Sequence, residues 1–336
     1  MTGAILNQNT NNPQKQTYFS TIILISLALI LLLFPAKCAT GVKLGIHIAL
    51  YSLIPAILPF MIFSNYVILS GYSEIIGKLV HPVIHQLFKT STNGSYAVLI
   101  GFLCGYPLGT KIICDLIKNN KISYREGAYL FCFANNPSLA FILCYAAPIC
   151  FPDKITIIKA LFLIYAPQVI IGMAIRKEDF MNTNDNHPDQ INGFQIPFSK
   201  VLDDSIVNAL TTTARLTGYI ILFSILSSLI SGISFLPYTL KATIPCILEL
   251  TSGIYQMNNS HIMNFAKPIL TIFFSIFGGM SVLFQISSIL NSVERPDRTG
   301  RNDDRNALKI SYYIKYKLFS ILLCIIFFMI MVGLDA

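Results

Sequence analysis

The sequence predicts an all-α protein that crosses a membrane several times. Of its 336 residues, 54% are hydrophobic and only 12% are charged, whereas about a quarter of the residues in soluble domains are charged. Several apolar runs approach or exceed the roughly 20 residues that a helix needs to cross a bilayer. Gly, Pro and Asn interrupt some of these runs near their middles. We therefore expect about eight transmembrane segments, some of them broken or re-entrant.

The charged and reactive residues argue against nucleic-acid binding and against catalysis. The net charge of +8 comes from lysines and arginines that cluster between the apolar runs, where membrane orientation explains them. No Ser/His/Asp set, nucleotide-binding glycine loop or pair of catalytic carboxylates is evident in the sequence. His81 and His85 lie four residues apart, but the Glu of an HExxH zinc site is missing. We expect no enzyme activity, no cofactor, no metal and no nucleic-acid partner.

The first half of the chain contains a terminal span and one structural unit. Residues 1–43 combine a polar N-terminus, without an evident cleavable signal, and a first span over 18–34. Residues 44–175 form the first unit. Its expected elements are a span over 44–70 kinked at Pro55 and Pro59, a helix along the membrane surface over 71–94, broken segments over 95–117 and 127–147, and a plain span over 155–175.

The second half restarts after a polar loop. Residues 176–200 show no periodic apolar pattern and divide the protein in two. Residues 201–292 form the second unit, and residues 293–336 form a charged loop and a last span over 318–334. The expected elements of the second unit are a long span over 206–233 and interrupted segments over 236–257 and 262–290.

The two units share an order of elements that suggests an internal repeat. In each, a long helix is followed by a segment broken at a Gly motif and by one broken at a polar motif of small residues. Gly109 precedes Ser138 by 29 residues, and Gly253 precedes Ser281 by 28. Helical hairpins of similar length would give similar spacing by chance, so both explanations stay open. A repeat would place a binding site at the interface of the two units.

The basic loops indicate how the chain is oriented. The loops over 118–126 and 293–317 are both rich in Lys and Arg, and we expect both on the cytoplasmic side. Either one segment enters the membrane and returns, or the middle loop over 176–200 lies on the outside. Pro245, Glu249 and Gly253 make the segment over 236–257 the poorest helix for contact with lipid. We therefore predict that this segment is the re-entrant one.

The breaks are the candidate solute-binding site. Irregular backbone survives at membrane depth only where protein buries it or where it lines a wet cavity, and transporters hold their substrates at such breaks. We predict that the breaks at 105–109, 135–138, 249–253 and 278–281 meet near mid-membrane; tightly packed kinked helices are the alternative. The candidate residues are Gly105, Tyr106, Pro107, Gly109, Thr110, Lys111, Asn135, Asn136, Ser138, Glu249, Thr251, Ser252, Gly253, Gly278, Gly279, Ser281 and Gln285.

Glu249 is the most informative of these residues, because an acid inside an apolar segment is expensive and normally faces a cavity or a partner. It could bind a proton, a cation or a ligand hydroxyl, or it could lie at the membrane interface if the segment over 236–257 does not reach the membrane centre. Lys111 could neutralise Glu249 or an anionic ligand, or it could pair with Asp115 one helical turn later. The amides of Asn135 and Asn136 can both donate and accept hydrogen bonds, which suits a sugar, a heterocyclic base or a peptide group.

Four motifs in order carry a resemblance to a known family. They are Gly105-Tyr-Pro-Leu-Gly-Thr-Lys111, Asn135-Asn-Pro-Ser138, Glu249-Leu-Thr-Ser-Gly253 and Phe277-Gly-Gly-Met-Ser-Val-Leu-Phe-Gln285. From about residue 45 to 290 the chain resembles the sporulation integral membrane protein YlbJ family, whose members carry a nucleoside-recognition or Gate domain. The chain departs from the family pattern at Thr110, where Ala is expected, and at Leu139, where a second Pro is expected.

The resemblance implies a protein with two Gate-type repeats that is made in the mother cell during sporulation and lies in mother-cell-derived membranes. We expect a transporter or permease-like protein that binds a small polar solute between the repeats. The alternative is a membrane scaffold without transport activity that binds partners during spore-envelope assembly. Its expected partners are the lipid bilayer, the solute, and further copies of itself or other spore-envelope proteins.

Overall fold

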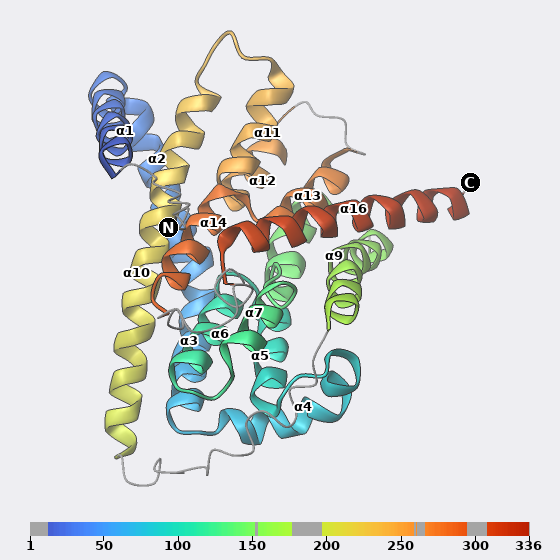
Figure 1. The fold of residues 1–336 in the computed structure, drawn as a ribbon. Helices are drawn as coiled ribbons and strands as arrows, with labels where there is room; N and C mark the ends of the chain where they lie inside the picture. The colour runs from blue at the N-terminus through green and yellow to red at the C-terminus, as the bar shows by residue number, and fades with distance from the viewer. Residues whose placement is uncertain are drawn as a thin grey trace, which may run out of the picture.

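Helices are the only regular elements in the part of the chain that the structure describes (Figure 1). The computed structural model describes residues 13–151, 154–176, 197–258, 260, 266–293 and 308–335. Most of the expected loop over 176–200 lies outside these residues. The elements of the first half are α1 Pro13–Leu33, α2 Pro35–Ile48, η1 Ala49–Leu53, α3 Ile54–Leu69, α4 Ser73–Phe88, α5 Thr92–Leu103, α6 Leu108–Lys118, α7 Tyr124–Phe131, η2 Phe141–Ala146, α8 Ala147–Cys150 and α9 Lys154–Ile175. Those of the second half are α10 Phe198–Ser231, α11 Tyr238–Leu248, α12 Leu250–Asn258, α13 Ala266–Phe277, α14 Gly279–Leu290 and α16 Ile310–Asp335.

Long apolar helices confirm a multi-pass membrane protein. Within the described residues, four helical stretches are long and apolar enough to cross a bilayer. They are Thr156–Ile175, Phe198–Ser231, Ala266–Leu290 and Ile310–Val332. A fifth is obtained if α2 and α3, which meet at an angle of 52°, together count as one bent span. The expected number of about eight and the internal repeat therefore stay predictions.

The longest helix, α10, packs along α2 and α3 over most of its length (Figure 1). Gly41 and Gly45 let α2 approach closely, because a Cβ at either position would run into the backbone of α10. The helix begins at Phe198, directly after Pro197, so residues 198–205 are helical and the span starts earlier than the predicted residue 206. Burial gives the reason: Val201, Ser205 and Ala209 repeat every four residues on the buried side of α10.

Helix α4 presents one apolar face to the outside of the molecule. Ile75, Leu79 and Val83, at successive four-residue steps, are all exposed, whereas Ser73 and Gly77 on the other side are buried. This helix forms extensive contacts with α5, and its apolar face is free to meet lipid. It is shorter than the predicted 71–94, because the chain turns at Lys89 in the left-handed region and α5 begins at Thr92.

Two pairs of short helices fold back on themselves as hairpins. In the pair of α11 and α12, a Cβ at Gly253 would collide with the backbone of Cys246, so the two helices approach closely. The segment predicted to be re-entrant is thus a helical hairpin. In the pair of α5 and α6, Gly109 lies against Gly101 across the turn. The segment over 95–117, predicted as a broken span, is a second hairpin, because its glycines permit contact between the two halves of the segment.

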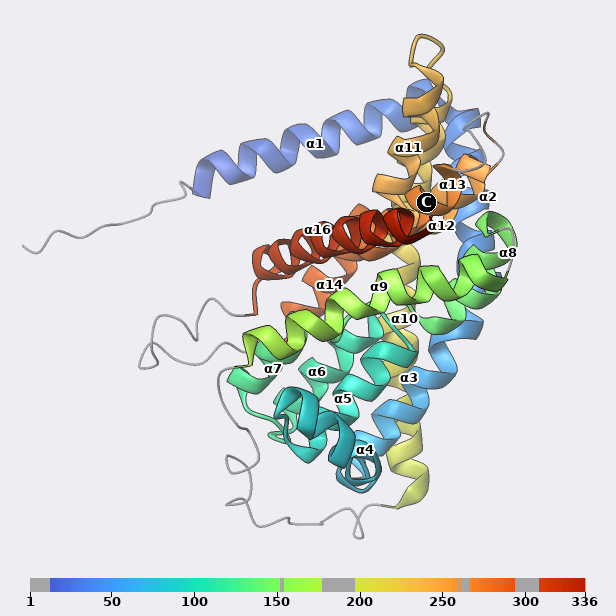
Figure 2. The ribbon, with the colours of Figure 1, turned by 90° about the vertical axis from the view of Figure 1, so that its right-hand side faces the viewer.

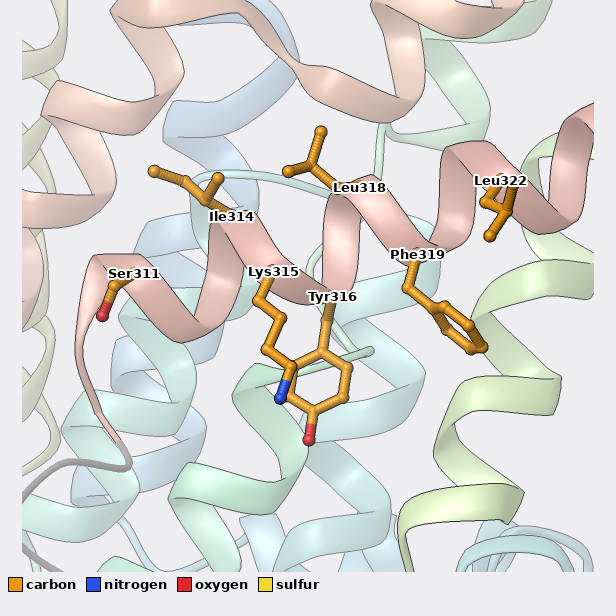
Figure 3. Close-up of a pocket in the computed structure, with 7 residues that line it drawn as sticks. All are labelled: Ser311, Ile314, Lys315, Tyr316, Leu318, Phe319 and Leu322. Carbon is orange, nitrogen blue, oxygen red and sulfur yellow. The ribbon is translucent and has the colours of Figure 1, made fainter.

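The last helix starts earlier than predicted and contains charged residues assigned to the loop. Helix α16 begins at Ile310 instead of residue 318, and it crosses the molecule beside α9 and α13 (Figures 1 and 2). Its outer side forms a shallow groove in which Lys315 and Tyr316 point the same way (Figure 3). Lys317, by contrast, is only 1% exposed and lies inside the protein.

Candidate functional site

The first two sequence motifs pack directly against each other. The turn between α5 and α6 contains Gly105, whose φ of 71° favours glycine. The next residue, Tyr106, donates its backbone N–H to the carbonyl of Asn136 at 2.6 Å. A Cβ on Gly101 or Gly109 would collide with the carbonyl oxygen of Ala134. The irregular segment between α7 and η2 therefore rests on the tip of the α5–α6 hairpin.

The third and fourth motifs form a second contact of the same kind. Glu249 sits at the tip of the α11–α12 hairpin in extended backbone. Its carboxylate accepts hydrogen bonds from the backbone N–H of Thr251 at 3.0 Å and of Ser252 at 2.6 Å, and so caps α12. Gly278 and Gly279, between α13 and α14, both have positive φ. A Cβ on Gly279 would lie 3.3 Å from the carbonyl oxygens of Cys246 and Ile247.

Tyr106 joins the two contacts. Its hydroxyl donates to the carbonyl of Ser275 in α13 at 3.1 Å. Its ring also lies beside Gly278, where an added Cβ would be 3.5 Å from the phenol carbon. The structure thus brings the four breaks together, while their depth in the membrane stays a prediction, and we call this region the four-break junction. It comprises residues 105–109, 135–138, 249–253 and 278–281.

A buried lysine that the sequence analysis missed also reaches the four-break junction. The Lys317 Nζ donates to the side-chain oxygen of Asn136 at 2.9 Å and lies 5.3 Å from the centre of the Tyr313 ring. In the described part of the chain, no carboxylate forms an ion pair with it. The sequence contained a signal for this position. The apolar pattern of α16 begins before Tyr313, which extends the helix upstream, and Tyr313 and Lys317 are then one helical turn apart on the same face.

Several buried polar atoms near Lys317 lack hydrogen-bond partners. They are the Thr110 hydroxyl, the Asn135 amide nitrogen and the Tyr313 hydroxyl. The Tyr313 hydroxyl lies beside the Asn135 amide, without a hydrogen bond of normal geometry between them. Leaving such a group unpaired costs about 1–3 kcal/mol. Together with the ammonium of Lys317, these groups form a buried polar cluster beside the four-break junction.

Other candidate residues have partners within their own segments. Lys111 forms a salt bridge with Asp115, with Nζ–oxygen distances of 2.6 and 2.5 Å, so the intrahelical alternative is the observed one. Gln285 donates its side-chain amide to the Ser281 hydroxyl at 3.1 Å. The Ser138 hydroxyl accepts the backbone N–H of Phe141 at 3.0 Å. These three contacts satisfy each side chain close to its own segment, whereas Lys317 and Glu249 form no ion pair within the described residues.

A second buried carboxylate lies away from the junction. The carboxylate of Glu126, in the first turn of α7, accepts the backbone N–H of Ser91 at 2.7 Å. Burial raises the pKa of Glu126 to about 7, although the hydrogen bond from Ser91 opposes this shift. His81 and His85 lie nearby on α4 and hydrogen-bond to Ser95 and to the carbonyl of Thr90. These groups tie α4, α5 and α7 together.

Comparison with known proteins finds one informative relative. Over 286 residues the chain is 23% identical to the sporulation integral membrane protein YlbJ of Bacillus subtilis (strain 168). The aligned region covers 75% of this chain and 70% of the relative. No model of a known protein family matches the chain, and no solved structure matches it. The similarity confirms the resemblance indicated by the four motifs, while the Gate domain and the nucleoside label stay predictions.

Proposed function

We propose that this multi-pass membrane protein, a relative of the YlbJ family of sporulation integral membrane proteins, carries a small polar solute across a membrane of the sporulating cell. The solute would bind at the four-break junction. Mother-cell-derived membranes are the proposed location, and the lipid bilayer is the surrounding partner. Association with further copies or with other spore-envelope proteins is part of the same proposal.

One observation carries this proposal: a buried ammonium without an ion-pair partner among the described residues contacts Asn136, in one of the four interrupted segments that meet at the junction. Intramembrane charges are costly and usually mark the path of a substrate or an ion. Lys317 uses one hydrogen bond, to Asn136, and its other N–H groups have no acceptor among the described residues. The orphaned polar atoms of Thr110, Asn135 and Tyr313 add donors and acceptors beside it. Broken helices with such groups are the usual construction of transporter sites.

A second candidate function, a scaffold without transport activity, is favoured by the packing of the junction. Asn135, Asn136 and Ser252 are fully buried, and glycines at the hairpins are in contact with backbone. Both oxygens of the Glu249 carboxylate already have donors in α12. In this alternative the breaks serve close helix packing and Lys317 only fixes Asn136. Transport would require the junction to open from this packed arrangement.

Replacement of Lys317 separates the two functions. Lys317→Met removes the charge at similar length, and Lys315→Met, on the outer side of the same helix, is the matched control (Figure 3). A scaffold should tolerate Lys317→Met, since replacing a buried charge by an apolar group can be neutral or stabilising. The variants are tested in a deletion strain for heat-resistant spores, with membrane abundance measured by immunoblot.

Solute binding is measured on the purified protein. We expect some members of a panel of amino acids, nucleosides, sugars and organic acids to raise its thermal midpoint by mass action. Lys317→Met should abolish both this response and the formation of heat-resistant spores at normal abundance, and Lys315→Met should preserve both. If Lys317→Met supports normal sporulation and no solute stabilises the wild-type protein, the transport proposal fails and the scaffold is preferred.

A further inference from the structure

Away from the four-break junction, three helices line one small polar cavity. It has a volume of about 130 Å³ and lies between α6, α10 and α14. Its lining residues are Lys111, Lys118, Asn208, Thr211, Thr212, Arg215, Leu216, Ser288, Ile289 and Ser292. We call it the basic cavity. No carboxylate is among these residues, although Asp115 lies behind Lys111.

The sequence spacing shows that the basic cavity is built by regular helix faces. On α10, Asn208, Thr211, Thr212 and Arg215 follow the spacing i, i+3, i+4, i+7, which places them on one stripe. A polar stripe of this kind in an otherwise apolar helix needs a polar environment. On α6, Lys111 and Lys118 are seven residues apart and share one face.

The charges in the basic cavity do not cancel. Lys111 is neutralised by its salt bridge with Asp115. Lys118 and Arg215 form no salt bridge within the described residues, so Lys111, Lys118 and Arg215 together with the one carboxylate of Asp115 leave an excess of two positive charges in this part of the structure. The nearest acids on α10, Asp203 and Asp204, are 12 and 11 residues before Arg215, or roughly 16–18 Å along the helix axis.

We propose that the basic cavity binds a phosphate group. A phosphate monoester carries a charge of about −1.5 to −2 at neutral pH and three strong acceptor oxygens, which matches two uncompensated cations and the surrounding polar side chains. Arg contributes a planar fork of donors and Lys a point charge, the two usual partners of phosphate. The group can belong to a lipid headgroup or to a soluble phosphate. This site does not depend on solute binding at the four-break junction.

Binding is tested on the full-length protein in detergent with two kinds of probe. The first is inorganic phosphate, compared with chloride at equal ionic strength. The second is a short-chain phosphatidic acid, compared with a short-chain phosphatidylcholine. The readout is the thermal midpoint as a function of probe concentration. The test variants are Lys118→Gln and Arg215→Gln, and Lys200→Gln, an exposed position on the same helix as Arg215, is the control.

We expect a saturable rise of the thermal midpoint in the wild-type protein and in Lys200→Gln, and an at least tenfold higher half-saturating concentration in both test variants. A response to phosphatidic acid alone assigns a lipid headgroup, and a response to both probes assigns the phosphate group itself. The proposal is overturned if neither phosphate probe acts, if chloride acts equally, or if the test variants respond like Lys200→Gln. The unliganded midpoint of each variant shows separately whether it is folded.

Discussion

At the scale of single residues, Glu249 has a helix-capping role that the sequence analysis did not predict. The carboxylate was expected inside an apolar segment and is there, only 4% exposed. The structure adds that it caps α12 through the N–H groups of Thr251 and Ser252. Part of the cost of burying this acid is therefore offset by hydrogen bonds that start a helix, because a charged acceptor forms stronger bonds than a neutral one.

Glu249→Gln should keep one of these hydrogen bonds, whereas Glu249→Leu should lose both. We expect Leu to lower the free energy of unfolding by about 1–2 kcal/mol, the usual value of a lost cap, and Gln to lower it less. If Glu249 also couples transport, Glu249→Gln abolishes heat-resistant spores at normal membrane abundance. Thermal unfolding in detergent and spore counts measure the two effects. Full sporulation with both variants would exclude Glu249 from the solute site.

Glu126 should make stability depend on pH. Its pKa is raised from about 4.5 to about 7 in the folded state, so between these values the folded protein binds more protons than the unfolded protein. The free energy of unfolding therefore falls by roughly 3 kcal/mol as the pH rises through this window, and it does not recover above pH 7.

Glu126→Gln should remove this component. We expect its thermal midpoint to exceed that of the wild-type protein at pH 8 and to fall less between pH 5 and pH 8. Glu74→Gln, a surface carboxylate on α4 that pairs with Lys78, is the control and should follow the wild-type profile. An unchanged profile in Glu126→Gln would show that Glu126 is ionised at little cost in the folded protein.

At the scale of elements, the two hairpins depend on glycines that sit against backbone. A Cβ at Gly101 would overlap the Ala134 carbonyl, and one at Gly253 would overlap the Cys246 backbone, whereas Gly218 in α10 has open space around it. Gly101→Ala and Gly253→Ala should each destabilise the protein by about 1–3 kcal/mol. Gly218→Ala should be neutral or stabilising by up to about 1 kcal/mol, because Ala favours helix. Thermal midpoints of the purified variants check all three, and equal midpoints would contradict the close packing.

The positions of the interrupted segments could be predicted from the sequence, but the way in which each segment folds could not. Gly, Pro and Asn placed all four breaks, because these residues are expensive in a lipid-exposed helix. They did not predict that the segment around Gly105 doubles back, since a kink and a hairpin use the same residues. The pairing of each hairpin tip with the following break depends on contacts between residues about 30 positions apart, such as Tyr106 with Asn136, which one sequence does not encode in any local pattern.

The beginning of α16 illustrates the same limit for charged residues. Lys315 and Lys317 looked alike in the sequence and were both assigned to a charged loop. One faces the outside and the other the four-break junction. Periodicity of the apolar positions could have extended the helix upstream, but the choice of which lysine is buried follows from the packing of Tyr313 and Asn136 around it.

At the scale of the whole molecule, the basic cavity links the two basic loops. Lys118 is the first residue of one loop and Ser292 directly precedes the other, and both line this cavity. The two loops should therefore face the same side of the membrane, as the distribution of Lys and Arg predicts.

Cysteine labelling tests this arrangement. Asn119→Cys and Asn291→Cys are introduced separately into a background with the exposed Cys144 replaced by Ser. A membrane-impermeant maleimide should label both in inverted vesicles and neither in intact cells, and the background protein and permeabilised vesicles serve as controls. Labelling of the two positions from opposite sides would refute the shared orientation.

The length of α10 decides where the ends of this helix lie relative to the bilayer. Its 34 residues extend about 51 Å, against a hydrocarbon layer of roughly 30 Å. A tilt within the usual range of 0–40° does not bring this length within the hydrocarbon layer. One end of this rod must therefore lie in water, and the end near Lys200, Asp203 and Asp204 has the charged residues suited to it. The first turns of this rod pack on α3, where the centre of the Phe198 ring lies 5.4 Å from that of Tyr66, so the last turn of α3 must reach the same aqueous depth.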